Sequence, residues 1–250
     1  MPSTGAATLA VARRDLGVQV TFRSLTRELV TADLSDAWSE RFESLPPVRV
    51  PRAYKGQRNF AGSWWFATTQ SHVAFESWLE RDHLMLLDFA PEVVAVAAQP
   101  FTLVLPTSSG PRKHTPDYFV RTVDGTGVVI DVRPDSRAAK DADVFDATAA
   151  ECERVGWDYQ RLGDITPDFA ANVRWLSGYR HPRCRLDDVA LQLLDAAATG
   201  NQTVGSLARA VGDPVVVLPC LFHLLWSGAL DAELPTRRLS MDSPVRRVRR

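Results

Sequence analysis

The stretch that decides the fold runs from residue 114 to residue 134 and reads HTPDYFVRTVDGTGVVIDVRP. Its apolar and alternating residues predict two strands, at 117–122 and 128–132. Asp124-Gly125 between them is a strong signal for a tight antiparallel hairpin. Asp117 opens the first strand and Asp131 ends the second, so the hairpin brings both carboxylates to one edge of the sheet. Facing side chains on adjacent antiparallel strands lie about 5 Å apart.

Two carboxylates at one sheet edge predict an oxygen-ligand site for magnesium or manganese. Such an ion polarises a scissile phosphate and lowers the pKa of a bound water, so that water can attack phosphorus. Arg133 follows Asp131 on the same face and could orient the nucleophile or stabilise charge on the phosphate. Asp131 ends a buried strand, where a carboxylate costs stability unless it is paired or metal-bound. The alternative is an ordinary ion pair between Asp131 and Arg133.

A third acid is expected upstream of the hairpin. Residues 71–88 predict a helix that ends before Pro91, with Val73, Leu79 and Leu86 on one face. Glu76 shares that helical face, so it should lie near the sheet and act as a third ligand, directly or through water. Glu80, one turn further on, is the nearest competitor, and Glu76 is preferred.

The remaining patterns predict an α/β sandwich with a mixed sheet. Strands are expected at 18–22, 93–97, 101–105 and 157–162, and a helix at 138–155. After a connector at 164–181, three short helices at 187–198, 204–211 and 219–227 and an apolar segment at 230–234 outline a winged helix-turn-helix. The expected divisions are an N-terminal arm at 1–45 whose first 15 or so residues are disordered, an α/β domain at 46–165, a winged-helix-like domain at 166–236 and an Arg-rich tail at 237–250.

Composition limits the class of protein. The chain has 250 residues, 45% of them hydrophobic and 24% charged, which is ordinary for a folded protein. No apolar run approaches the roughly 18 residues of a membrane span, and no signal peptide is expected. The three scattered cysteines suit reduced thiols and a cytoplasmic location. The histidines have no paired spacing, so a zinc site is not expected.

The charge distribution suggests where a partner could bind. The net charge is −1, but residues 237–250 hold six arginines beside Asp242. This tail could contact nucleic acid or an acidic partner, or it could be a solubilising end. Residues 210–236 contain no Arg, Lys, Asn or Gln, so the winged helix is expected to dock a partner rather than read bases. Phosphate contacts are expected instead from the tail and from the Arg-rich connection at 49–58. The aromatics at 64–66 could be a core wedge or a surface for bases.

The HTPD sequence at 114–117, followed by VIDVRP at 129–134, resembles the signature of PD-(D/E)xK nucleases. Together with FESWLE at 75–80 and FAPEVVAVAAQP at 89–100, it is similar to the TnsA-type endonuclease subunit of heteromeric transposases, in its actinobacterial form. The resemblance covers roughly residues 50–165, with a looser match through the C-terminal region. The motifs are short, and their order and spacing carry the specificity.

The resemblance implies a restriction-endonuclease-like domain that nicks double-stranded DNA at transposon ends, using magnesium or manganese. It implies a DDE-type transposase subunit and an ATPase regulator as partners. Glu76 would be the catalytic glutamate, Asp117 the metal-binding aspartate, Asp131 the acid or glutamine position and Arg133 the lysine position.

Arg133 departs from the family pattern because arginine stays protonated and is a poor general base. Either it acts only electrostatically, or Lys140 or Lys113 reaches the site, or catalysis is weakened. Two other functions therefore remain open. One is a self-sufficient restriction or repair nuclease, and the other is a non-catalytic scaffold that keeps the nuclease fold for assembly.

Overall fold

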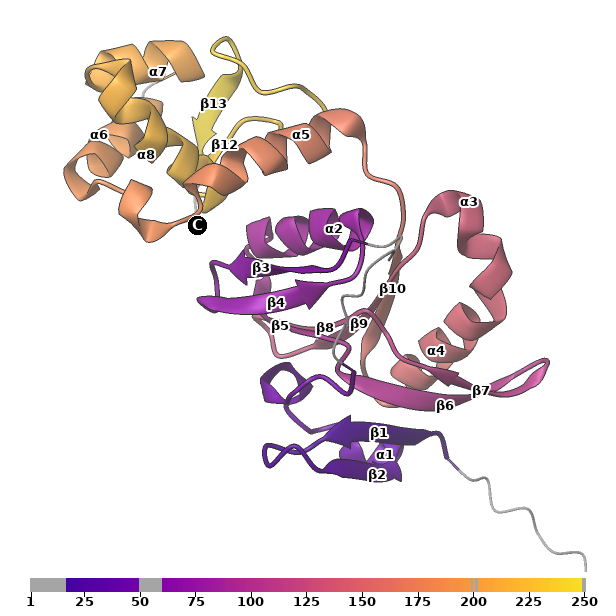
Figure 1. Cartoon of the computed structure of the whole chain (residues 1–250). Coiled ribbons are helices and arrows are strands. Elements are labelled where there is room, and N and C mark those ends of the chain that lie inside the picture. Colours follow the sequence, from indigo (N-terminus) through magenta and orange to yellow (C-terminus); the bar gives the residue numbers. More distant parts are fainter. Residues whose placement is uncertain (1–16, 50–59, 199, 201, 249–250) are drawn as a thin grey trace, which may run out of the picture.

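The computed structural model describes residues 17–49, 60–198, 200 and 202–248 (Figure 1). Its central sheet has the order β10-β9-β8-β5. The strands are β5 (Val93–Ala98), β8 (Tyr118–Thr122), β9 (Gly127–Val132) and β10 (Asp158–Leu162). β9 is parallel to β10, and the other pairs are antiparallel. The chain is therefore a mixed α/β protein, as predicted.

The predicted β8–β9 hairpin is confirmed. Tyr118 pairs with Ile130 in the antiparallel register. In the turn, Asp124 Oδ1 accepts hydrogen bonds from the Thr122 hydroxyl at 2.6 Å and from the Thr126 backbone N–H at 3.0 Å. Gly125 has a φ of 91°, which glycine adopts without steric cost. The turn therefore sets the register that brings Asp117 beside Asp131.

Each face of the central sheet is covered by a different set of elements (Figure 1). α2 (Trp78–Phe89) lies over one face, together with the hairpin of β3 (Gly62–Phe66) and β4 (Ser71–Phe75). α4 (Ala142–Arg154) covers the other face. Successive residues of a strand point to opposite faces of the sheet. Tyr118 and Ile130 therefore lie in the hydrophobic cluster on the face covered by α2, whereas Phe119 and Val129 lie in the cluster on the face covered by α4.

The described part of the expected N-terminal arm, residues 17–45, packs onto this second face. β1 (Gln19–Arg23) and β2 (Leu29–Asp33) join β6 (Phe101–Thr107) and β7 (Gly110–His114) in a sheet of order β2-β1-β6-β7. α1 (Leu34–Ala37) and the 3₁₀ helix η1 (Phe42–Ser44) follow β2. Phe42 of η1 makes edge-to-face contacts with Phe22, Phe101, Phe119 and Trp157. Residues 17–45 are therefore not a separate arm, because they share the core of the α/β domain.

The predicted single helix over residues 71–88 is wrong in its first half. Residues 71–75 form strand β4, and α2 begins only at Trp78. Val73 and Phe75 are buried with the period of a strand and face the aromatic strand β3. The Ser77 hydroxyl accepts the Glu80 N–H at 3.2 Å and so caps the helix. Glu76 therefore precedes the helix.

The structure also differs from the prediction on either side of β10. The single helix expected at 138–155 is replaced by α3 (Asp135–Ala138), the 3₁₀ helix η2 (Ala139–Asp141) and α4. The connector expected at 164–181 contains α5 (Pro167–Leu176) and the 3₁₀ helix η3 (Ser177–Tyr179). α5 begins with proline at its first turn, a position where the missing N–H costs nothing.

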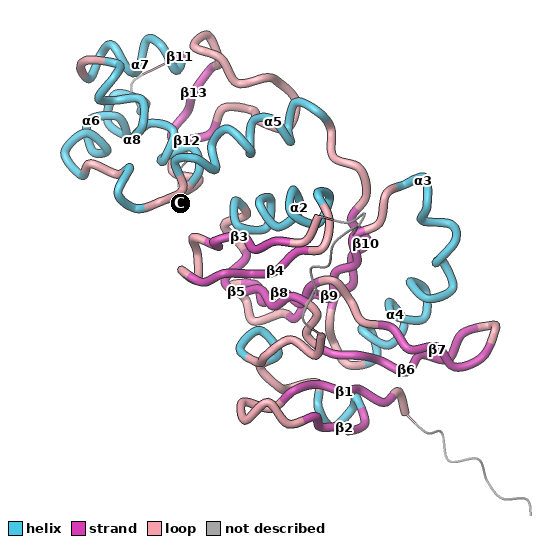
Figure 2. The backbone as a smooth tube through the Cα atoms, in the orientation of Figure 1, coloured by secondary structure: helices cyan, strands magenta, loops and turns pink. Residues whose placement is uncertain are grey.

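The C-terminal part contains the three predicted helices, α6 (Asp187–Ala198), α7 (Val204–Val211) and α8 (Pro214–Trp226), after the 3₁₀ helix η4 (Pro182–Cys184). The third helix was predicted to start at 219, but α8 begins at Pro214 and Pro219 lies inside it. A small sheet accompanies them in the order β11-β13-β12, formed by β11 (Gln202–Thr203), β12 (Leu230–Asp231) and β13 (Pro244–Arg247) (Figure 2). The described part of the Arg-rich tail thus includes a strand, with Val245 buried.

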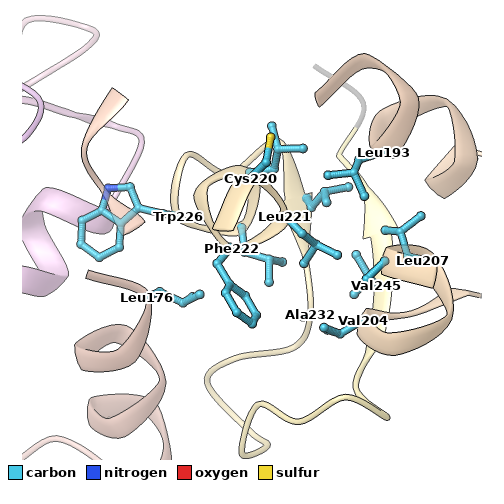
Figure 3. Close-up of a cluster of buried hydrophobic side chains, with 14 of the residues drawn as sticks. Leu176, Leu193, Val204, Leu207, Cys220, Leu221, Phe222, Trp226, Ala232 and Val245 are labelled. Carbon is cyan, nitrogen blue, oxygen red and sulfur yellow. The ribbon is translucent and has the colours of Figure 1, made fainter. Parts of the chain in front are cut away.

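A large hydrophobic cluster holds this part together. Leu193, Leu207, Leu221 and Val245 come from α6, α7, α8 and β13 and gather in one core (Figure 3). Met85 of α2 joins the same cluster, so the C-terminal part packs against the helix that covers the central sheet. Among the described residues, no helix is long and apolar enough to cross a membrane.

Candidate active site

Asp117 lies where the sequence predicted, directly before β8 and at the edge of the sheet. Its Oδ2 accepts the backbone N–H of Val132 at 2.7 Å, which ties it to the end of the neighbouring strand β9. The pairing of Tyr118 with Ile130 continues outward to Asp117 and Asp131. The predicted meeting of these two residues across the hairpin is therefore present.

The surroundings of Asp117 disfavour its negative charge. Burial above all, and then the nearby Glu80 and Asp131 carboxylates, raise the pKa of this carboxyl to about 8, because the Val132 N–H and Arg133 only partly oppose them. Without a further cation, Asp117 is therefore mostly protonated at neutral pH. A bound cation would favour the charged form, because it would offset both the burial and the like charges.

Asp131 is buried, with 3% of its surface exposed, and it is held by hydrogen bonds rather than by Arg133. Its Oδ2 lies 2.9 Å from His114 Nε2 and accepts the Tyr159 hydroxyl at 3.0 Å. The alternative pairing of Asp131 with Arg133 is absent from the described contacts. Arg133 Nε instead lies 3.3 Å from Asp141 Oδ2, in an ion pair without hydrogen-bond geometry.

Of the two candidate glutamates, Glu80 is coupled more closely to Asp117. Its half-buried carboxylate accepts the Glu76 N–H at 2.7 Å and the Ser77 hydroxyl at 2.8 Å. Burial raises the pKa of Glu80, and the neighbouring Glu76 raises it further. Glu80 is also the charged group that most strongly raises the pKa of Asp117.

Glu76, the preferred residue, lies between the end of β4 and the Ser77 cap of α2, so it is not on the helical face with Val73 and Leu79 that motivated the choice. Its carboxylate accepts a hydrogen bond from Arg49 at 2.8 Å. Arg49 also donates to Gln99 at 3.2 Å. The structure therefore places Glu76 near Glu80 but under the influence of a cation from the N-terminal region.

The position of Arg133 allows an electrostatic role. Its charge lowers the pKa values of both Glu80 and Asp117, so it lies close enough to influence them. Lys113 is an exposed residue of β7 and Lys140 an exposed residue of η2. None of the described contacts brings either lysine to the acids.

The donor set matches magnesium or manganese in chemistry. No three described His, Cys, Asp or Glu side chains are grouped closely enough to surround a metal ion by themselves. Magnesium, however, is commonly held by one or two carboxylates, with water and substrate phosphate completing its shell. Asp117 and Asp131 provide that number, with Glu80 coupled to Asp117. The burial of Asp117 beside two other acids, which raises its pKa, is the observation that favours a cation here.

The sequence analysis did not foresee the contacts of His114 and Tyr159 with Asp131, and it assigned Arg49 to phosphate rather than to Glu76. His114 was visible as the start of the HTPD stretch, yet its contact with Asp131 joins strands of two different sheets. Tyr159 reaches Asp131 through the parallel β9–β10 register, in which it pairs with Val129. Such contacts depend on topology, and local spacing carries no signal for them.

The raised pKa of Asp117 predicts how stability depends on pH. The carboxyl ionises near 3.8 in an unfolded chain and near 8 in the folded one, so the folded state holds an extra proton between these values. Its contribution to stability is complete below pH 3.8 and is lost as the pH rises through 8. We expect Asp117→Asn to be more stable than the wild type at pH 8, with a difference that disappears toward pH 4.

Thermal melts of both proteins across this range, without divalent metal, provide the measurement. Burial also lowers the pKa of His83 and raises that of Asp88, but both shifts occur in either protein and cancel in the difference. A stability difference that does not change with pH would contradict the environment described for Asp117.

Comparison with protein-family models and with curated proteins gives no match for this chain.

Proposed function

We propose that this protein is a magnesium- or manganese-dependent DNA endonuclease subunit. The observation that carries the proposal is the carboxylate edge: Asp117, with a pKa of about 8, is flanked by Asp131 and Glu80. A divalent ion held there supplies an activated water and polarises the scissile phosphate. Asp117 and Asp131 are its proposed ligands, with Glu80 or Glu76 as the third acid. Arg133 stays protonated and stabilises negative charge on the phosphate.

The order of elements supports a restriction-endonuclease-like core. Helix α2, strands β5, β8 and β9, helix α4 and strand β10 follow one another in the chain, with the helices on opposite faces of the mixed sheet. The acids lie at the edge that the β8–β9 hairpin creates. We interpret α6, α7 and α8 with the β11-β13-β12 sheet as a winged-helix-like domain.

Ion pairs within the chain support the proposal that another protein directs this subunit to its DNA site. Three of the four described arginines of the tail lie near acids of the same chain: Arg246 lies 2.5 Å from Asp231, Arg247 3.5 Å from Asp195 and Arg238 3.7 Å from Asp168. Arg49 of the proposed phosphate-binding connection is paired with Glu76, and residues 50–58 lie outside the described residues. These pairs reduce the positive charge that Arg49 and the described part of the tail offer to phosphate.

Helix α8 supports the same conclusion. It carries no Arg, Lys, Asn or Gln, and its exposed positions include Val215, with 81% of its surface accessible. Such a helix suits protein contact better than base recognition. We therefore propose double-stranded DNA as the substrate, a DDE-type transposase subunit as the partner that selects the cleavage position, and an ATPase as a regulator.

A non-catalytic scaffold is the second candidate, and the observation that favours it is the engagement of Arg133 with Asp141. An arginine held away from the phosphate would leave the site weakened. The electrostatic coupling of Asp117 to Glu80 and Asp131 favours the nuclease.

The test is nicking of supercoiled plasmid by purified protein with magnesium or manganese, alone and with the proposed DDE-type transposase partner. We expect nicking that requires the divalent ion and is stimulated by the transposase. Equal nicking with and without the transposase would favour a self-sufficient nuclease. No nicking under any condition, with transposase binding intact, would favour the scaffold.

A comparison of two conservative variants tests which glutamate completes the site. Because Glu80 is the closer electrostatic neighbour of Asp117, we expect Glu80→Gln to lower the nicking rate by about tenfold more than Glu76→Gln, or about 1.4 kcal/mol. Plasmid nicking under saturating manganese measures both. The opposite order would restore Glu76 as the third acid, as the family resemblance implies.

A further inference from the structure

Asp131 receives two hydrogen-bond donors on the same oxygen. His114 Nε2 lies 2.9 Å from Oδ2, and the Tyr159 hydroxyl lies 3.0 Å from it. His114 ends β7 of the N-terminal sheet, whereas Tyr159 belongs to β10 of the central sheet. The side chains of His114 and Asp131 are 13% and 5% exposed. The contact is therefore shielded from water and made by elements far apart in sequence.

Both side chains donate their hydrogen bonds to Asp131. A carboxylate oxygen only accepts hydrogen bonds, so Tyr159 must donate through its hydroxyl and His114 through Nε2–H. Burial and the adjacent Asp131 carboxylate raise the pKa of Tyr159, which keeps the hydroxyl protonated. With Oδ2 held twice, the carboxylate plane is fixed, and Oδ1 is the oxygen that remains available to a cation.

We propose that His114 and Tyr159 are positioning residues, which hold Asp131 in the orientation that binds the divalent ion. This inference rests on the proposed function, since it assigns the two side chains to the same metal centre. Partners that hydrogen-bond to metal-ligating carboxylates fix their orientation, and losing one typically costs 10- to 100-fold in metal affinity or activity. Neither residue is expected to touch the ion or the DNA.

The geometry also permits a simpler role, in which the contact only braces the N-terminal sheet against the central one. The two roles predict different measurements. A brace contributes to the free energy of unfolding and leaves the metal affinity of the folded protein unchanged. A positioning contact changes that affinity in protein that remains folded.

The experiment is calorimetric titration of the full-length protein with manganese at pH 8, without DNA. The variants are Tyr159→Phe, which removes only the hydroxyl, His114→Ala, which removes the donor, and His114→Gln, whose amide nitrogen reaches about as far as Nε2. We expect about tenfold weaker manganese binding for Tyr159→Phe and His114→Ala. His114→Gln is expected to recover most of the affinity. Thermal melts of each variant confirm that it is folded at the titration temperature.

Each outcome decides the inference. Wild-type affinity in folded Tyr159→Phe and His114→Ala would overturn it and leave the brace, while the proposed metal centre would stand. Weakened binding in His114→Ala that His114→Gln does not recover would also overturn the donor role of His114. No manganese binding by the wild type would overturn the inference together with the metal centre itself.

Discussion

Replacing Asp117 by asparagine is expected to abolish metal-dependent nicking, with a loss of at least about a hundredfold. The reason is that Asp117 is a proposed metal ligand whose negative charge the protein disfavours, because burial and two neighbouring acids raise its pKa. The bound ion would compensate that charge. The electrostatic contribution of a catalytic metal amounts to several kcal/mol, and about 2.7 kcal/mol corresponds to a hundredfold in rate. Plasmid nicking with manganese measures the loss.

The design separates catalysis from folding. Asparagine keeps an oxygen that can accept the Val132 N–H, and it removes a like charge, so the variant is expected to be at least as stable as the wild type at pH 8. Glu153→Gln is the matched control, because Glu153 is an exposed acid of α4 whose loss should leave nicking unchanged. Persistent metal-dependent nicking by Asp117→Asn would mean that the activity arises elsewhere or from a contaminant.

The second large effect concerns stability and the N-terminal region. Phe42 is fully buried and contacts four aromatic rings, the closest being Phe101 at a centroid distance of 4.7 Å. Truncation to alanine leaves a cavity among rings that belong to both sheets. We expect Phe42→Ala to lower the free energy of unfolding by about 3–5 kcal/mol. Urea denaturation monitored by circular dichroism provides the measurement.

Leu25→Ala is the control for this prediction. Leu25 lies between β1 and β2 and is 76% exposed, so its truncation is expected to cost less than about 0.5 kcal/mol. If Phe42→Ala were no more destabilising than this control, residues 17–45 would have to be a separable arm. A large loss with a single cooperative transition would confirm that they share the core.

The parts of the fold that were predictable are those whose signals are local. Asp124-Gly125 between two apolar runs defined the hairpin, and its register brought Asp117 to Asp131. The bounds of α6 and α7 also agree with the prediction, since the apolar periodicity that indicates each helix lies within its own short segment.

The parts that failed depend on partners distant in sequence. The apolar residues Val73, Ala74 and Phe75 are compatible with either a helix or a strand, and only the pairing of residues 71–75 with the aromatic strand at 62–66 decides for a strand. Because of that error, the sequence analysis placed Glu76 on a helical face and preferred it to Glu80. In the structure Glu80 has the larger electrostatic effect on Asp117. Likewise, the donors on Asp131 come from strands whose adjacency follows from sheet order, which spacing in the sequence does not encode.

The central claim is that the carboxylate edge at Asp117 is a metal centre, and the most direct test is to locate manganese in a crystal. Anomalous scattering from crystals grown with manganese at pH 8 would place the ion without reference to activity. We predict a peak within coordination distance of the Asp117 and Asp131 carboxylates that is absent from Asp117→Asn crystals. An empty edge at a manganese concentration that supports nicking, or an equal peak in the variant, would contradict the account.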